Sequence, residues 1–157
     1  MKTMIAVALI SMVCMSCGQE PAGTHQKQDE KWMAGTWQLV TGTLIEKGDT
    51  TVTDYTGGVS FIKIINNTHF AFLQHDRKKG KDSAVFVSGG GPYALTDSSY
   101  TEHLEYCSAR EWEGNDFTFR IELKGDTLIQ SGTEKVDSAG VDRINIEKYV
   151  RIKGGLK

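Results

Sequence analysis

The segment Asp116–Lys124 reads DFTFRIELK, and its side chains alternate between polar and apolar. The apolar positions are Phe117, Phe119, Ile121 and Leu123. A period of two is typical of a strand that buries one face. Gly125-Asp126 follows directly, and the chain continues as TLIQSGT over Thr127–Thr133. A Gly-Asp pair between two such runs predicts a β-hairpin.

Similar short runs recur after Trp32, and no segment there keeps a helical period. We expect further strands at Thr36–Ile45, Val59–Ile65, His69–Gln74, Ala84–Ser88, Tyr93–Leu95, Tyr100–Tyr106 and Asn145–Lys153. In the last run Ile146, Val150 and Ile152 alternate with Glu147, Tyr149 and Arg151. Short strands separated by turn dipeptides favour an all-β fold, an antiparallel up-and-down barrel of about eight to nine strands. Such a barrel holds packed side chains or one small ligand.

The first residues have the order of a secretory leader. Lys2 precedes an apolar run at Met4–Val13, and the small residue Ser16 stands directly before Cys17. This order predicts a signal peptide at residues 1–16. It resembles the lipobox of bacterial lipoproteins, in which the cysteine after the cleavage point carries the lipid. Cys14 and Met15 depart from the Leu and the small residue that the lipobox prefers, so the agreement is at Ser16 and Cys17.

The resemblance implies that Cys17 is a lipidated N-terminus and that the protein is anchored to a bacterial membrane in the cell envelope. Two or more acyl chains give stable anchoring, which one chain does not. The polar segment 18–31 then forms a flexible tether, so that residues 17–31 link the anchor to a barrel domain at 32–157. The alternatives are a secreted protein without lipid and a single membrane span. A span needs about 20 apolar residues, more than this run provides.

Charge and cysteine content exclude several classes of protein. The formal net charge is −2 and the isoelectric point is about 6.1, which argues against nucleic-acid binding. With Cys14 in the leader and Cys17 lipidated, Cys107 is left without an intrachain disulfide partner. We interpret Cys107 as a buried apolar thiol, since no nucleophile motif surrounds it.

Two stretches resemble a known family. Gly35-Thr36-Trp37, at the start of the first expected strand, is similar to the G-x-W opening of lipocalins and related calycin barrels. The run GGGPYALTDSSYTEHLEY at Gly89–Tyr106 resembles small lipocalin-like domains of secreted and lipid-anchored bacterial proteins of unknown function. The resemblance implies a barrel whose lower end is closed by Trp37, with Gly35 beside it and Arg151 of the last strand stacked on its ring.

A lipocalin-like barrel implies a small, partly apolar ligand. Glu102 shares a strand face with Tyr100, Leu104 and Tyr106, so we expect it to point into the barrel. It either orients a ligand or is a scaffold carboxylate paired with a neighbour. The expected ligand-binding residues are Trp37, Phe61, Tyr93, Tyr100, Glu102, Tyr106 and Phe119.

The second hypothesis is a filled barrel that presents its loops to other envelope components. Five phenylalanines could fill the interior: Phe61, Phe70, Phe72, Phe117 and Phe119. No catalytic motif is present, so an enzyme that uses Glu102 is a remote third hypothesis. We expect no cofactor and no metal, because the pairs His103/Glu105 and His69/His75 do not provide the three or four convergent ligands of a zinc site. The oligomeric state stays open.

The lipid anchor gives a first prediction. Replacing Cys17 with serine (Cys17→Ser) should move the protein from the membrane fraction to the soluble fraction of a bacterial host, because serine cannot carry the thioether-linked lipid. Cys14→Ser is the matched control and should stay in the membrane fraction. Equal membrane association of Cys17→Ser and the natural chain would contradict the anchor.

Overall fold

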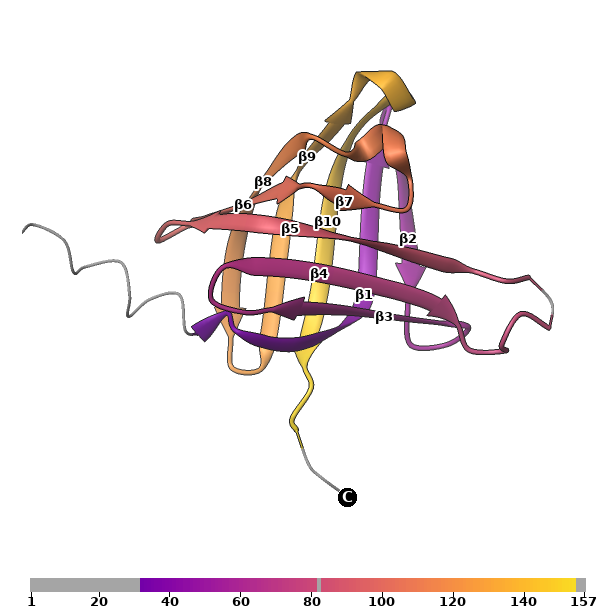
Figure 1. The fold of residues 1–157 in the computed structure, drawn as a ribbon, viewed down its shortest axis with the longest axis horizontal. Helices are drawn as coiled ribbons and strands as arrows, with labels where there is room; N and C mark the ends of the chain where they lie inside the picture. Colours follow the sequence, from indigo (N-terminus) through magenta and orange to yellow (C-terminus); the bar gives the residue numbers. More distant parts are fainter. Residues whose placement is uncertain (1–31, 82, 155–157) are drawn as a thin grey trace, which may run out of the picture.

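The computed structural model describes residues 32–81 and 83–154, which form an all-β domain (Figure 1). The segments assigned above to the leader and the tether, residues 1–16 and 17–31, lie outside the described residues. The described strands are β1 (Gly35–Glu46), β2 (Asp49–Asp54), β3 (Val59–Ile65), β4 (His69–Asp76), β5 (Phe86–Leu95), β6 (Ser99–Leu104), β7 (Tyr106–Cys107), β8 (Asn115–Lys124), β9 (Thr127–Val136) and β10 (Val141–Arg151). Two short 3₁₀ helices, η2 (Arg110–Trp112) and η3 (Asp137–Ala139), lie in the connections.

Eight of these strands close an antiparallel barrel, as the sequence predicts. The order around the barrel is β1, β10, β9, β8, β6, β5, β4 and β3, and β3 pairs again with β1. β2 and β7 are additional: β2 pairs with β1, and β7 pairs with β5. Closure leaves the eight barrel strands paired on both sides, which removes edges that would favour aggregation.

β1 changes its partner halfway along its length. Gly35–Gln38 pairs with β3, whereas Thr41–Glu46 pairs with β2. The pairing with β10 runs along both halves and shifts its register between Leu39 and Thr41. The second half of β1 is therefore not paired with β3, and β2 takes that place beside it.

The boundaries of β5 differ from those expected from the sequence. Ala84–Ser88 and Tyr93–Leu95 were predicted as two strands, but one strand, Phe86–Leu95, runs through the glycines. A Cβ at Gly90 would lie 2.5 Å from the carbonyl oxygen of Phe70, and one at Gly89 would lie 2.5 Å from the Phe72 ring. These glycines thus allow close contact with β4 in mid-strand, at residues that the two expected strands left unassigned.

The expected strand Tyr100–Tyr106 ends at Leu104, and its last residue faces the wrong way for a ligand contact. Tyr93 pairs with Glu102, but Gly90 pairs with Tyr106, so the β7 register is displaced by one residue. A one-residue shift turns every following side chain to the other face. Tyr106 is 67% exposed on the outer surface, and the prediction that it contacts a ligand inside the barrel is wrong.

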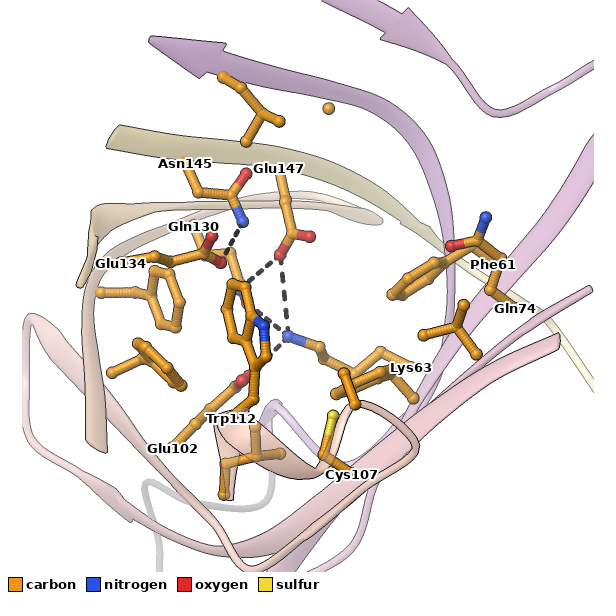
Figure 2. Close-up of a pocket in the computed structure, with 18 of the residues that line it drawn as sticks. Phe61, Lys63, Gln74, Glu102, Cys107, Trp112, Gln130, Glu134, Asn145 and Glu147 are labelled. Carbon is orange, nitrogen blue, oxygen red and sulfur yellow. Dashed lines mark hydrogen bonds and ion pairs between the residues drawn. The ribbon is translucent and has the colours of Figure 1, made fainter. Parts of the chain in front are cut away.

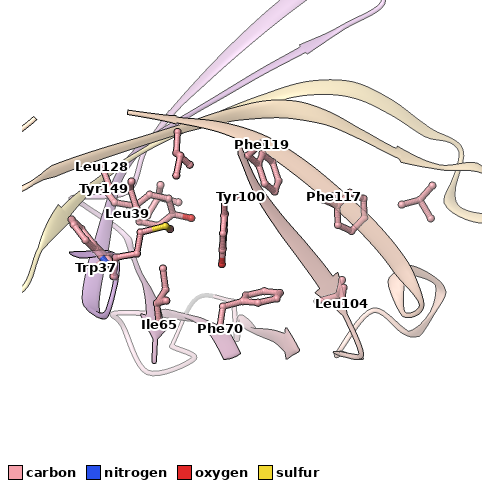
Figure 3. Close-up of a cluster of buried hydrophobic side chains, with 13 residues drawn as sticks. Trp37, Leu39, Ile65, Phe70, Tyr100, Leu104, Phe117, Phe119, Leu128 and Tyr149 are labelled. Carbon is pink, nitrogen blue, oxygen red and sulfur yellow. Dashed lines mark hydrogen bonds between the residues drawn. The ribbon is translucent and has the colours of Figure 1, made fainter. Parts of the chain in front are cut away.

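Thirteen buried apolar side chains form the core (Figure 3). It extends from Trp37 and Leu39 past Tyr100 and Phe119 to Phe117 and Leu104. Trp37, Tyr100 and Tyr149 are the largest fully buried side chains. The barrel is therefore solid around Trp37.

Trp37 and Arg151 close this end. They are cross-strand partners, and the Arg151 guanidinium carbon lies 4.0 Å from the centre of the Trp37 ring, which confirms the predicted contact. Arg151 also donates hydrogen bonds to the carbonyl oxygens of Ala34 and Trp32. A Cβ at Gly35 would lie 2.6 Å from Arg151 Nη1, so glycine leaves the space that the guanidinium fills.

This packing predicts unequal losses for two tryptophans. Trp37→Ala should lower the free energy of unfolding by about 3–5 kcal/mol, because it removes a fully buried ring and the arginine stack. Trp32→Ala should cost clearly less, since Trp32 is only partly buried and offers Arg151 a backbone oxygen that alanine keeps. Denaturant titration of both variants measures the difference, and equal losses would contradict the closing role of Trp37.

Candidate binding cavity

A cavity of about 260 Å³ lies inside the barrel (Figure 2). Its aromatic lining consists of Tyr55, Phe61, Phe72, Trp112, Phe117 and Phe119. Its ionisable lining includes Lys63, Glu102, Glu134, Arg143 and Glu147. An aromatic wall with a few polar groups is the usual composition of a small-molecule site.

β10 supplies much of the polar lining. Arg143, Asn145, Glu147, Tyr149 and Arg151 alternate along it, and all five face the barrel interior. On the opposite side of the strand Val150 is 37% exposed and Ile144 44% exposed. The apolar side of this alternating run therefore faces solvent, and the polar side faces inward. The interior tolerates these residues because they are partners for one another.

Lys63 lies at the centre of the polar network (Figure 2). Its side chain is 3% exposed, and its Nζ lies 2.5 Å from Glu102 Oε1 and 3.1 Å from Gln130 Oε1. Glu147 Oε2 is a second carboxylate neighbour at 3.9 Å. Removing one partner of a buried ion pair is costly, because the other charge is left without compensation.

Aromatic rings surround the same ammonium group. Lys63 Nζ lies 5.2–6.0 Å from the ring centres of Phe70, Tyr100, Phe119 and Tyr149. The faces of such rings attract cations. The rings and the carboxylates together make up for the water that Lys63 loses on burial.

Glu147 has one oxygen in the network and one outside it. Its Oε2 accepts hydrogen bonds from Gln130 Nε2 at 2.7 Å and from the Tyr149 hydroxyl at 2.8 Å. Its Oε1 has no hydrogen-bond partner among the described residues. The Glu147 carboxylate therefore keeps acceptor capacity at the cavity surface.

Glu134 is fully paired by contrast. Arg143 Nε donates a hydrogen bond to its Oε2 at 2.7 Å, and Arg143 Nη2 forms an ion pair with the same oxygen at 2.7 Å. Asn145 Nδ2 donates to its Oε1 at 2.7 Å. The Arg143 guanidinium also lies 5.3 Å from the centre of the Trp112 ring in η2. η2 is linked to η3 by a hydrogen bond from the Ser138 hydroxyl to the Glu111 carbonyl oxygen. Trp112 is thus fixed beside the cavity.

Burial shifts the titration of several groups at the base of the cavity. Desolvation raises the pKa of Glu102, and the Lys63 charge opposes that shift. Burial, with Glu102 nearby, raises the pKa of Tyr100, and burial with Glu147 nearby raises that of Tyr149. Both tyrosines are therefore neutral. The Tyr100 hydroxyl is buried and has no hydrogen bond of good geometry among the described residues.

The residues predicted to bind a ligand are distributed over three places. Phe61, Glu102 and Phe119 line the cavity. Trp37 and Tyr100 are buried in the core, and Tyr93, whose hydroxyl donates to the Asn66 carbonyl oxygen, packs against that core. None of these three lines the cavity, and Tyr106 lies outside the barrel. The register shift brings Cys107 to the lining instead, as a half-buried thiol.

Several lining residues were not identified from the sequence. They are Lys63, Gln130, Glu134, Arg143, Asn145 and Glu147. Strand parity could have found three of them: once Arg151 is placed inward against Trp37, the residues four, six and eight positions earlier that share its face are Glu147, Asn145 and Arg143. Lys63 likewise shares a face with Phe61 and Ile65.

The histidines do not join this site. His103 Nδ1 lies 2.8 Å from Asp116 Oδ1, and His69 and His75 are exposed on β4. Among residues 32–81 and 83–154, no three His, Cys, Asp or Glu side chains converge on a metal position. No helix in these residues has the length and apolarity to cross a bilayer.

No protein-family model matches the chain, and no curated protein shows significant similarity to it. The strand pairing gives a closed antiparallel barrel, which is consistent with a lipocalin-like architecture.

The buried network gives a thermodynamic prediction. Lys63→Met should lower the free energy of unfolding by about 3–5 kcal/mol, because Glu102 is left as a buried carboxylate without its cation. Glu102→Gln in the Lys63→Met background should recover part of this loss. Since unpaired carboxylates are protonated more easily, the deficit of Lys63→Met should shrink as the pH falls toward 4.5. Denaturant titration of Lys63→Met, Glu102→Gln and the double variant at two pH values measures both effects. If the losses of the two single variants add up to the loss of the double variant, the coupling is contradicted.

Proposed function

We propose that this protein is a non-enzymatic binding protein whose barrel holds one small, partly apolar molecule. The observation that supports the proposal is the cavity, because it combines aromatic walls with polar groups that have unused bonding capacity. A volume of about 260 Å³ lies near the lower end for ligand pockets, so the ligand is small. A cavity of roughly 150 Å³ already holds a benzene ring.

The proposal includes the place of action. A lipid on Cys17 and a tether at residues 18–31 would hold the barrel at a bacterial membrane, on the outer membrane or the periplasmic face. A lipocalin-like domain on such an anchor would bind its ligand in the cell envelope. The competing function is a structural or interaction lipoprotein whose cavity holds no ligand.

A cavity-filling variant distinguishes these two functions. Val87 lines the cavity from β5, and Val87→Phe adds a ring to that space. Val52 on β2 is 64% exposed, so Val52→Phe is a matched change away from the cavity. The readout is ligand-observed NMR with the neutral probe 2-phenylethanol, with native mass spectrometry of protein from its own host to detect a co-purified molecule.

We expect the natural chain and Val52→Phe to bind 2-phenylethanol, and Val87→Phe to bind at least about tenfold more weakly, a difference of about 1.4 kcal/mol. The binding function would be contradicted, and the structural one favoured, by two results together. The first is that the natural chain binds the probe no better than Val87→Phe does, and the second is that no molecule co-purifies with the protein.

A further inference from the structure

The charges inside the cavity do not balance. Its lining includes two basic side chains, Lys63 and Arg143, and three carboxylates, Glu102, Glu134 and Glu147. The tyrosines near them stay neutral, because burial raises their pKa values. Burial raises the pKa of Glu102, and the Lys63 ammonium 2.5 Å away opposes that shift. When Glu102 is ionised in this ion pair, the lining carries a net charge of −1.

The surplus negative charge can be assigned to one residue. Arg143 is paired with Glu134 through a hydrogen bond from Nε and an ion pair from Nη2, each at 2.7 Å, and Lys63 Nζ lies 2.5 Å from Glu102 Oε1. Glu147 is 3.9 Å from Lys63 and has neutral hydrogen-bond donors as its other partners. Its Oε1 is also the oxygen without a hydrogen-bond partner among the described residues.

The Phe61 ring lies across the cavity from this carboxylate (Figure 2). The Phe61 ring stacks on Phe72 with centres 5.8 Å apart, and Tyr55 meets its edge at 5.9 Å. The Phe61 ring is also 6.5 Å from that of Tyr149, whose hydroxyl binds Glu147. The Glu147 charge contributes to the raised pKa of the Tyr55 hydroxyl, after burial, so this ring too lies within its field.

We propose that the ligand of this cavity is an organic ammonium cation with a small apolar part, bound with its nitrogen at Glu147 and its apolar part against Phe61 and Tyr55. An ammonium group offers the donors that Glu147 Oε1 lacks and compensates the net charge. Ring faces provide additional attraction for a cation in a desolvated site. A carboxylate ligand is disfavoured, since its charge would add to the surplus negative charge in a low-dielectric space.

This inference rests on the proposed binding function, and the experiment separates the two. Three probes share a phenyl ring and a short chain: 2-phenylethylammonium, 2-phenylethanol and phenylacetate. Their affinities are measured by calorimetry at pH 7.5 for the natural chain, for Glu147→Gln and for Glu105→Gln. Glu105 is an exposed carboxylate outside the cavity lining, so Glu105→Gln is the matched control.

The natural chain and Glu105→Gln should bind the ammonium at least about tenfold more tightly than the alcohol, and phenylacetate most weakly. Glu147→Gln should lose most of the preference for the ammonium while it keeps its affinity for the alcohol, which also shows that this variant is folded. If Glu147→Gln does not fold, the order of the three affinities on the natural chain still tests whether the cavity prefers a cation.

Binding of the alcohol as tightly as the ammonium, or tighter binding of phenylacetate, would overturn the inference and leave the binding function intact. An ammonium preference that Glu147→Gln retains would overturn the assignment to Glu147. Failure of all three probes to bind would remove the binding function, and the inference with it.

Discussion

The burial of Lys63 between Glu102 and Glu147 is the constraint on which the interior of this barrel depends. A lysine ammonium that is nearly inaccessible to water needs its partners in place. These partners come from different strands: Glu102 from β6, Gln130 from β9 and Glu147 from β10. A slip of one residue in any of these strands would turn its partner to the outside. We infer that the network contributes more to the register of the barrel than to its stability.

β10 organises the interior around this network. Arg151 stacks on Trp37 at the closed end, and Arg143 stacks on Trp112 beside the cavity. Glu147 and Tyr149 lie between the two arginines on the same strand face. The same strand therefore contributes to the closed end, to the polar base of the cavity and to its lining. The half of β1 that pairs with β2 also lines the cavity, through Gly42 and Leu44, and β2 contributes Thr53.

The alternation in Asp116–Lys124 predicted both the strand and its buried face, because Phe117, Phe119 and Ile121 are buried and their polar neighbours are not. In β10 the same kind of alternation has its polar face inward. A period of two identifies a strand but not its buried side when ionic pairs replace apolar packing. The one-residue register shift before Tyr106 could not be predicted either, since it depends on the pairing of Tyr106 with Gly90. Glu102 was placed inward correctly, but its partner Lys63 is 39 residues away in the sequence.

The central claim is that the interior network leaves a carboxylate, Glu147, available to a bound cation. The most direct measurement is a crystal structure of the protein grown with 2-phenylethylammonium. The account predicts electron density for the probe in the cavity, with its nitrogen within hydrogen-bond distance of Glu147 Oε1 and its ring against Phe61. A cavity filled by protein side chains, or a probe nitrogen placed away from Glu147, would contradict it.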